Sequence, residues 1–404
     1  MTNDGQPMSD NYFLQQPAPE NIEARKAELG AWFEIDLNDI AFNLKAIRDR
    51  VGPHVEIMPV VKNDAYGHGL RPIVAALAAD GVNWFMVART AEALAIRESG
   101  ITSGIVNMDA LYTDGQYQRI VEQDISQVIY TPAAAEKLTV AARAIGRKAG
   151  VFIKIDTGLR RVGVPAAEAV SFIETIAASA HLEIRGIFST FMLHPERDAG
   201  VLARFRAITD ELAEKGIDPG YCSLASSHGI FHSPEAWLGM VRPALSLFGI
   251  YNGDEDRTAG LALRQALCFK ARIEHLKWIE AGDSVTYFGR FTATERMRVG
   301  TLHVGFYDAV PREHSNTGQI LVDNVLRPCI GSVSLNHYLF DATGLNVREG
   351  DVVEVYSRAA GNNIADASET AGWMTYSLLN HLNPFVPRIY YRGKTPVAIL
   401  ERSV

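Results

Sequence analysis

A lysine stands at the end of an apolar run in the segment PVVKNDAYGHGL, residues 59–70. Burial disfavours the charged form of an amine, so a lysine at the end of a buried strand has a lowered pKa and a nucleophilic free amine. Such an amine forms an imine with a carbonyl compound, including pyridoxal phosphate. Lys62 is therefore a candidate for covalent chemistry, although a lone lysine at a strand end more often extends its charge into solvent.

Histidines form a second pattern that could do chemistry. His228 and His232 in HGIFH have the i, i+4 spacing that places two imidazoles on one helix face, where they can bind a metal ion. No third ligand is evident from the sequence, so we expect no metal site. His194 in MLHPERD could reach a site at a strand end, or it could lie in a solvated loop.

Eight short apolar runs would have to position these residues. They are VEIMPVVK, WFMVA, GIVNM, SQVIY, VFIKIDT, LEIRGIF, YCSLA and GMVRPALSLFG. Most of them are separated by alanine-rich amphipathic stretches whose spacing is typical of helices. Strands that alternate with helices indicate a parallel sheet, and eight units predict an α/β fold, a (β/α)8 barrel of TIM type, over residues 31–258. A doubly wound sheet is the alternative, but no G-x-G-x-x-G follows the first strand.

The pattern changes near Ala259. Beyond it the chain is rich in strand-like segments with glycine and Asn/Asp between them, and it has few helical stretches. We therefore expect a mainly β C-terminal domain over residues 259–404. Residues 1–30 have neither pattern, and we expect them to be a loosely ordered N-terminal extension.

Composition excludes several classes of function. A formal net charge of −8 on 404 residues argues against a general affinity for nucleic acid or an anionic membrane. The N-terminus has no secretory pattern, and no apolar run is long enough to span a bilayer. The three cysteines are widely spaced, which favours reduced thiols over disulfides. We expect a cytoplasmic protein that binds neither nucleic acid nor membrane.

Seven further segments in register change the interpretation of the lysine. They are AWFEIDLNDIAFNLKAIR (31–48), IKIDTGLRRVGV (153–164), MVRPALSLFGIY (240–251), VTYFGRFTA (285–293), VGFYDAVPR (304–312), GSVSLNH (331–337) and VPRIYYR (386–392). With VVKNDAYGHG, these segments resemble alanine racemase and its relatives, the fold-type III pyridoxal-phosphate enzymes. The resemblance covers almost all of the chain beyond residue 30. It implies pyridoxal 5'-phosphate as cofactor, an amino-acid substrate, and a homodimer with shared active sites.

The resemblance also implies roles around the cofactor. Lys62 corresponds to the Schiff-base lysine, which is also the base on one face of the cofactor. Tyr66 corresponds to a tyrosine that contacts the cofactor phosphate. Ser227, together with backbone N–H groups near Ala244 and Leu245, corresponds to the rest of the phosphate site, since such donors hold a dianion well.

Three basic residues match further positions of the family. Arg242 corresponds to the arginine that faces the pyridine nitrogen, where a guanidinium that cannot give up its proton keeps the ring nitrogen unprotonated. Arg161 corresponds to the arginine on the phenolate side of the cofactor. Lys154 stands where some members carry a carbamylated lysine, and a simple salt bridge is the alternative.

Tyr287 corresponds to the second catalytic base of the family, which the partner subunit supplies. Racemisation requires two groups, because one removes the α-proton and the other returns a proton to the opposite face. By itself Tyr287 would be assigned to the packing of a sheet. In register with the lysine motif, we expect it to be catalytic.

Several positions depart from the family pattern close to the substrate. They are Thr190 for the usual histidine at the cofactor ring, Ser226 for asparagine, Leu335 and Asn336 for a Met-Asp pair, and Phe306 and Pro384 for two gate tyrosines. We retain Thr190 and Ser226 as cofactor contacts, and Arg161, Leu335, Asn336 and Phe306 as substrate contacts. Asn336 lacks the charge of an aspartate, so the substrate need not be alanine.

We therefore predict an amino-acid racemase, an isomerase that uses Lys62 and Tyr287 as its two bases. The alternative keeps the cofactor but changes the reaction to decarboxylation, aldol cleavage or transamination of an unusual amino acid. A pyridoxal-phosphate-binding protein without turnover ranks last, because barrel-only relatives of that kind lack the β domain that this chain has.

Overall fold

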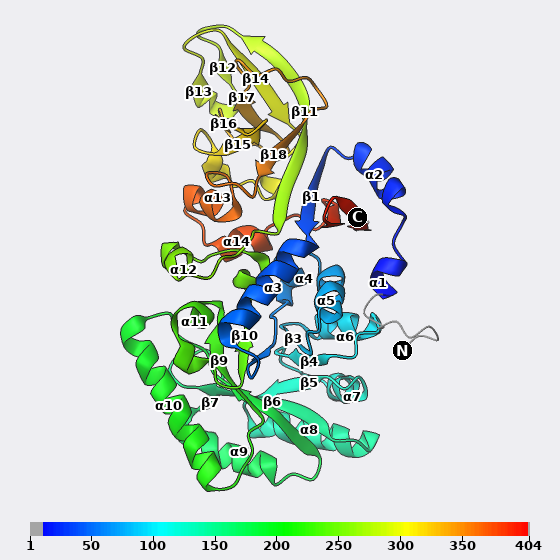
Figure 1. The fold of residues 1–404 in the computed structure, drawn as a ribbon, viewed down its shortest axis with the longest axis vertical. Helices are drawn as coiled ribbons and strands as arrows, with labels where there is room; N and C mark the ends of the chain where they lie inside the picture. The colour runs from blue at the N-terminus through cyan, green and yellow to red at the C-terminus, as the bar shows by residue number, and fades with distance from the viewer. Residues whose placement is uncertain (1–10, 403–404) are drawn as a thin grey trace.

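Eight parallel strands form a barrel in the N-terminal part of the chain (Figure 1). The computed structural model describes residues 11–402. Around the barrel the strands follow the order β2-β10-β9-β8-β6-β5-β4-β3, and the N–H of Val61 donates to the carbonyl of Met86 to join the two ends. The strands are β2 (Glu56–Ile57), β3 (Trp84–Val87), β4 (Gly104–Asn107), β5 (Ser126–Ile129), β6 (Ala149–Asp156), β8 (Leu182–Phe188), β9 (Tyr221–Ser226) and β10 (Met240–Arg242). All eight overlap the predicted apolar runs, so the predicted barrel is confirmed.

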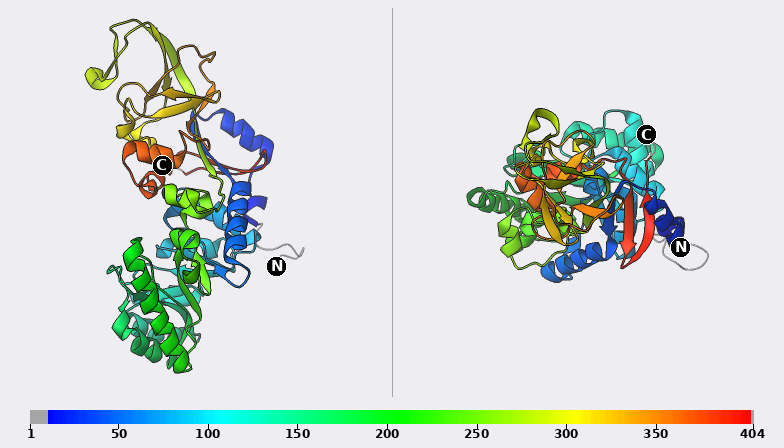
Figure 2. Two further views of the ribbon diagram at one scale, coloured as in Figure 1. Left: turned by 60° about the vertical axis from the view of Figure 1, so that its left-hand side comes forward. Right: turned by 90° about the horizontal axis from the view of Figure 1, so that it is seen from above.

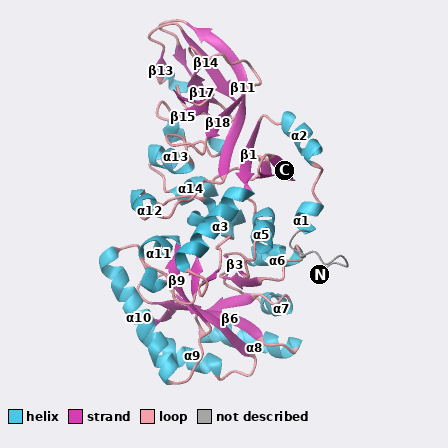
Figure 3. Cartoon of the chain, in the orientation of Figure 1, coloured by secondary structure: helices cyan, strands magenta, loops and turns pink. Residues whose placement is uncertain are grey.

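Helices surround these strands, as Figure 3 shows. They are α3 (Leu37–Val51), α4 (Lys62–Tyr66), α5 (Leu70–Ala79), α6 (Thr90–Glu98), α7 (Asp114–Glu122), α8 (Pro132–Ile145), α9 (Ala169–Ala177), α10 (Pro195–Glu214), α11 (Ser227–His232) and α12 (Asp254–Thr258). In α8 the hydroxyl of Thr131 accepts from the N–H of Ala134, and Gly146 ends the helix at φ 78°. No helix of residues 11–402 is long and apolar enough to cross a membrane.

The C-terminal part is mainly β and lies beyond one end of the barrel (Figure 2). Its main sheet has the order β16-β15-β18-β11-β1-β19-β20, and β14 and β17 extend from β11. Its strands are β11 (Leu267–Ile279), β12 (Ser284–Val285), β13 (Phe291–Thr292), β14 (Met297–Leu302), β15 (Gln319–Val322), β16 (Val325–Pro328), β17 (Tyr338–Asp341), β18 (Val352–Tyr356), β19 (Arg388–Arg392) and β20 (Thr395–Leu400). Two short helices, α13 (Ile364–Ala371) and α14 (Thr375–Asn380), follow β18. The predicted mainly β domain is confirmed.

Strand β1 (Ala31–Asp36) joins the two parts of the molecule. It precedes the barrel in sequence, but it pairs antiparallel with β11 and parallel with β19. Phe33 stacks on Phe269 across that pairing, with ring centroids 4.5 Å apart. The division of the chain between residues 258 and 259 stays a prediction. Strand β1 belongs to the barrel part in sequence, but its strand-to-strand hydrogen bonds are made with the C-terminal sheet.

The N-terminal residues that the structure describes are helical and packed. Helix α1 (Asn11–Leu14) and helix α2 (Pro19–Ala27) precede β1, and α2 contacts β20. Ile22 of α2 is fully buried with Leu29, Trp32 and Ile389. The expectation of loose order is therefore wrong for residues 11–30, because both segments are helical and Ile22 of α2 packs against Trp32 and Ile389 of the second sheet. Residues 1–10 of the predicted extension lie outside the described residues.

Candidate active site

The carboxyl ends of the barrel strands surround a cavity of about 510 Å³. Parallel strands end at one face of a barrel, so residues from distant parts of the sequence meet there. Seven of the predicted site residues line this cavity: Lys62, Tyr66, Arg161, Thr190, Ser226, Arg242 and Ala244. Lys154 lines it as well.

Lys62 begins α4, which is not an ordinary helix. The four residues after it have φ between 51° and 57°, so they form a left-handed turn. This conformation costs about 1–2 kcal/mol per residue other than glycine, so other contacts must hold it. The carboxylate of Glu92 accepts from the N–H of Asp64 at 3.0 Å, and the Asp64 side chain accepts from the N–H of Leu70 at 2.9 Å. Asp64 also pairs with Arg402.

The surroundings of Lys62 favour its neutral amine. Burial lowers the pKa of Lys62, and the positive charge of Arg161 lowers this pKa further. The carboxylate of Glu92 acts in the opposite direction but does not offset the other two causes. Lys62 thus has the lowered pKa that the sequence analysis required of a nucleophilic lysine.

Two buried basic side chains, Lys154 and Arg242, also line the cavity. Lys154 on β6 donates to the hydroxyl of Thr190 at 2.8 Å. Arg242 on β10 donates to the Ser223 hydroxyl at 2.5 Å and to the Ser189 carbonyl at 2.7 Å. Nζ of Lys154 lies 4.8 Å from the centroid of the Phe188 ring, and Cζ of Arg242 lies 5.0 Å from it.

These hydrogen bonds all end on neutral oxygens, and the electrostatic consequences are large. Burial lowers the pKa of Arg242 to about 10. Burial also holds the pKa of Lys154 well below its usual range, and the nearby Arg242 and Arg161 add to this effect. Clustered positive charge of this kind favours an anionic ligand. The residues present therefore fit a negatively charged cofactor such as pyridoxal phosphate.

Ser227 lies at the start of α11 among potential phosphate donors. Its hydroxyl oxygen accepts from the N–H of Ala244 at 2.9 Å and from the hydroxyl of Ser246 at 3.0 Å. Ser227 is 7% exposed and Leu245 is 1% exposed. Ser227 thus lies beside Ala244, and the role of Ser227, Ala244 and Leu245 in holding a phosphate stays a prediction. Ser246, two residues after Ala244, was not among the predicted residues.

A second tyrosine, which the sequence analysis also missed, lines the cavity beside Tyr66. Tyr376 of α14 lies with its ring centroid 5.6 Å from that of Tyr66. Burial raises the pKa of Tyr376 to about 12 and raises that of Tyr66 above its usual range, so both hydroxyls keep their protons and can donate. No local signal identifies Tyr376, because α14 is far from the barrel motifs in the sequence. Tyr376 brings a phenol to the wall of the barrel cavity.

The remaining predicted residues line a separate depression of about 430 Å³ in the C-terminal domain: Tyr287, Phe306, Leu335 and Asn336. It shares no residue with the cavity at the barrel. The turn Tyr287–Gly289 lies between β12 and β13, which Figure 1 places at the end of the molecule remote from the barrel. Tyr287 is 69% exposed. Within one chain the fold therefore does not bring Tyr287 to Lys62.

His194 and Pro384 are not among the residues that line either of these two depressions. His194 precedes α10, and its N–H donates to the carboxylate of Asp198 at 3.1 Å. The interpretation of His194 as a loop residue fits this placement.

Comparisons with known proteins agree with the fold. Residues 35–252 match the family model of the alanine racemase N-terminal domain, and residues 266–390 match that of the alanine racemase C-terminal domain. The alanine racemase of Symbiobacterium thermophilum is 31% identical over 376 residues, which cover 90% of this chain and 97% of that protein.

Solved structures show the same relationship. Alanine racemase from a D-cycloserine-producing Streptomyces lavendulae superposes with a TM-score of 0.83 at 30% identity, over 90% of this chain and 97% of that one. Alanine racemase from Bartonella henselae, which holds covalently bound pyridoxal phosphate, has the same fold with a TM-score of 0.79 at 24% identity, over 90% of this chain and all of that one.

Two family models account for nearly the whole described chain, and a full-length relative exceeds 30% identity. The barrel cavity is lined by Lys62, Lys154 and Arg242, and Ala244 of its wall donates to the hydroxyl of Ser227. The chain therefore belongs to the alanine racemase family and is a pyridoxal-phosphate-dependent racemase.

Proposed function

We propose that this racemase acts as a homodimer, with Lys62 of one subunit and Tyr287 of the partner subunit as its two bases. The separation of the two depressions is the observation that carries this proposal. Lys62 lines the cavity at the barrel, and Tyr287 is largely exposed in a different depression of the same chain. A two-fold arrangement allows one surface of each chain to complete the site of the other.

Different residues of the cavity would bind the cofactor and transfer the proton. Bound pyridoxal phosphate supplies an electron-withdrawing ring that acidifies the α-hydrogen of an attached amino acid. Lys62 would take up or release a proton at Nζ on one side, and its lowered pKa increases the fraction of the neutral amine at a given pH. Arg242 remains protonated and would face the cofactor ring. The Ser227 oxygen accepts from the N–H of Ala244, so Ser227 would hold the phosphate end by donating its own hydroxyl proton.

The substrate that we propose is a neutral α-amino acid, alanine or one with a larger side chain. Relatives at about 30% identity are alanine racemases, which supports alanine as one substrate. Arg161 lines the barrel cavity, so its charge is available for the substrate carboxylate. Asn336, Leu335 and Phe306 form one face with Tyr287 and would approach the substrate from the partner subunit. None of these three side chains carries a charge.

The other reactions that the substitutions raised are not favoured. The similar proteins are alanine racemases, and the alignments cover nearly their whole length. The segment that carries Tyr287 is present in this chain. A protein without turnover would have no use for that segment. We propose the cytoplasm as its location, on the sequence features described above.

The function is tested by proton exchange in D₂O. The holoenzyme is incubated separately with the L- and D-forms of alanine, serine, valine, leucine and methionine. NMR then records loss of the α-proton, and chiral chromatography records the opposite enantiomer. For at least one of these amino acids, we expect loss of the α-proton and formation of the opposite enantiomer. Tyr287→Phe should abolish exchange from one enantiomer and retain it from the other, because only one face loses its base.

Two outcomes would contradict the proposal. Release of CO₂ or of an aldehyde in place of the opposite enantiomer would replace racemisation by another reaction. Equal exchange from both enantiomers in Tyr287→Phe would remove Tyr287 from catalysis. Borohydride reduction followed by peptide mass spectrometry provides the control, since it should attach the cofactor to the peptide with Lys62 in both proteins.

A further inference from the structure

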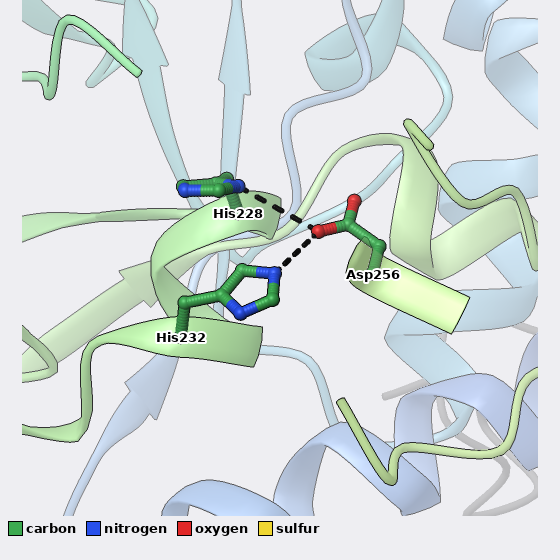
Figure 4. A group of neighbouring side chains, drawn as sticks. All are labelled: His228, His232 and Asp256. Carbon is green, nitrogen blue, oxygen red and sulfur yellow. Dashed lines mark hydrogen bonds and ion pairs between the residues drawn. The ribbon is translucent and has the colours of Figure 1, made fainter. Parts of the chain in front are cut away.

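We propose that His228, His232 and Asp256 form a binding site for a divalent transition-metal ion, with Zn²⁺ as the ion that fits best. The site lies on the outer side of the barrel domain, between α11 and α12, and is shown in Figure 4. The two histidines suggested a metal from the sequence, but no third ligand was evident there. The fold supplies that ligand from α12, 24 residues after His232.

The three side chains converge on one point. Nε2 of His232 lies 2.8 Å from Oδ1 of Asp256, and Nδ1 of His228 lies 3.6 Å from the same oxygen. The two imidazole rings have centroids 4.6 Å apart, and one ligand atom from each residue lies within 4.8 Å of the others. Figure 4 shows both rings directed toward the carboxylate.

These distances are close to those of a filled site. Zn²⁺ lies about 2.0–2.1 Å from imidazole nitrogen and carboxylate oxygen, so two ligands of a tetrahedral site are separated by about 3.4 Å. His228 and Asp256 already have this separation, at 3.6 Å. His232 needs a shift of roughly half an ångström, and it is an exposed residue near the end of a short helix. The fourth position would be open to water.

The carboxylate is held in place by its surroundings. Asp256 is 3% exposed, and its Oδ2 accepts from the N–H of Asn252 at 3.1 Å while Oδ1 faces the histidines. A ligand oriented by an outer hydrogen bond is a usual feature of metal sites. Asp198 and Glu255 lie close enough to His228 to add negative potential. Two imidazoles and one carboxylate form a ligand set that suits zinc.

A second group of the same composition differs in its setting. Glu274, His303 and His337 lie together in the C-terminal domain, with nitrogen–oxygen distances of 3.5 Å and 3.3 Å. The carboxylate of this group is exposed, whereas that of Asp256 is buried. An exposed carboxylate is free to rotate away, so this group offers the ion less preorganisation and provides the comparison for the test.

Metal binding would connect two elements near the proposed cofactor site. His228 directly follows Ser227, so an ion held by both helices would fix the start of α11 relative to α12. The site itself does not depend on the proposed role of Ser227. Zinc affinity and racemase activity are therefore measured separately, and each can fail without the other.

The test uses the holoenzyme with a tag that contains no histidine, after dialysis against a chelator. Zn²⁺ is titrated in competition with a chromophoric chelator, and Co²⁺ is added to a second sample to record its visible absorption. We expect one equivalent of Zn²⁺ per chain at high affinity. His228→Gln and His232→Gln should each weaken this binding by about ten-fold or more, whereas the double variant His303→Gln/His337→Gln should not change it.

Three results would overturn the proposal. The first is that the wild-type protein and the double variant His228→Gln/His232→Gln bind Zn²⁺ with the same affinity. Binding could be lost in His303→Gln/His337→Gln, which would place the ion in the C-terminal domain. The Co²⁺ spectrum could be that of the hydrated ion. His232 is exposed, so His232→Gln is expected to fold, and a circular dichroism melt verifies this.

Discussion

The protonation of Lys62 depends on a few neighbouring residues. Burial is the largest cause of its lowered pKa, Arg161 is the second, and Glu92 opposes both. A neutral amine is the reactive form, so these residues determine the pH range in which Lys62 can react. Arg160, the neighbour of Arg161, is exposed and is not among the charges that act on Lys62.

Arg161→Met should raise the pKa of Lys62, because it removes a positive charge that disfavours the protonated amine. The rate at which the cofactor-free protein takes up pyridoxal phosphate increases as pH rises through this pKa, so its midpoint should move to higher pH. The midpoint should stay below that of an exposed lysine, because burial remains.

The measurement is the absorbance change on cofactor addition between pH 6 and pH 10, with Arg160→Met as the matched control. A midpoint that moves downward in Arg161→Met, or that moves equally in both variants, would contradict this account of the Lys62 pKa.

The left-handed turn of α4 is held from α6. The Glu92 carboxylate accepts from the N–H of Asp64 at 3.0 Å, of Arg89 at 3.2 Å and of Ala88 at 3.3 Å. The turn points Tyr66 back toward the cavity, and Gly67 follows where a Cβ would lie 2.6 Å from the Leu379 carbonyl. Two helices thus position the lysine and the tyrosine together.

Glu92→Ala should lower the free energy of unfolding by about 1–3 kcal/mol, because it leaves partly buried N–H groups without their acceptor. It should also weaken cofactor binding, since the turn between Lys62 and Tyr66 loses its support. Urea unfolding monitored by circular dichroism measures the first effect.

Glu98→Ala provides the control on the same helix. Its side chain is 63% exposed and pairs with Arg71 at a distance of 3.8 Å, so the change should stay within about 0.5 kcal/mol. Equal losses in the two variants would show that Glu92 contributes only as a residue of α6.

Helix α14 contributes Tyr376 to the cavity. Tyr376→Phe keeps the ring against Tyr66 and removes only the hydroxyl. If this hydroxyl donates to the cofactor phosphate, the dissociation constant of pyridoxal phosphate should rise by about ten-fold or more, because a hydrogen bond to a charged group contributes about 1.5–3 kcal/mol. Equilibrium dialysis measures the constant. Tyr112→Phe, at a residue that is 78% exposed, should leave it unchanged. An unchanged constant in Tyr376→Phe would remove Tyr376 from the phosphate site.

At the scale of the whole molecule, the proposed site is divided between two surfaces. The cavity at the barrel carries Lys62, and the depression of the C-terminal domain carries Tyr287. Strand β1 binds the start of the barrel domain to the C-terminal sheet, so the two domains are connected at more than one point of the chain. This connection limits how far one chain could fold back to bring Tyr287 to its own Lys62.

Mixing two inactive variants tests the division. Lys62→Ala and Tyr287→Phe should each lose racemisation, whereas subunit exchange between them produces dimers with one intact site. Random exchange should restore about a quarter of the wild-type activity, since half of the dimers are mixed and each has one complete site of two. Lys62→Ala mixed with itself provides the control. No recovery after verified exchange would place both bases in one chain.

Much of the fold could be predicted from local patterns. Each of the eight barrel strands overlaps an apolar run. Lys62 ends one run and Ser227 follows another, and Arg242 is the last residue of β10. Strand ends of a parallel barrel meet at one face, so these residues could be placed together without a structure. The prediction is wrong at residues 11–30, because Ile22 of α2 finds its apolar partners only in the folded protein.

By itself the sequence determined the barrel, the cofactor and the family, because hydrophobic periodicity and the order of motifs can be recognised in a single sequence. Only the tertiary structure decided which sheet β1 joins, that Tyr376 lies beside Tyr66, and that Lys154 and Arg242 share one buried ring. It alone brought Asp256 to His228 and His232, and it alone separated Tyr287 from Lys62. These are contacts between residues far apart in sequence. They are determined by tertiary packing, which hydrophobic periodicity does not predict.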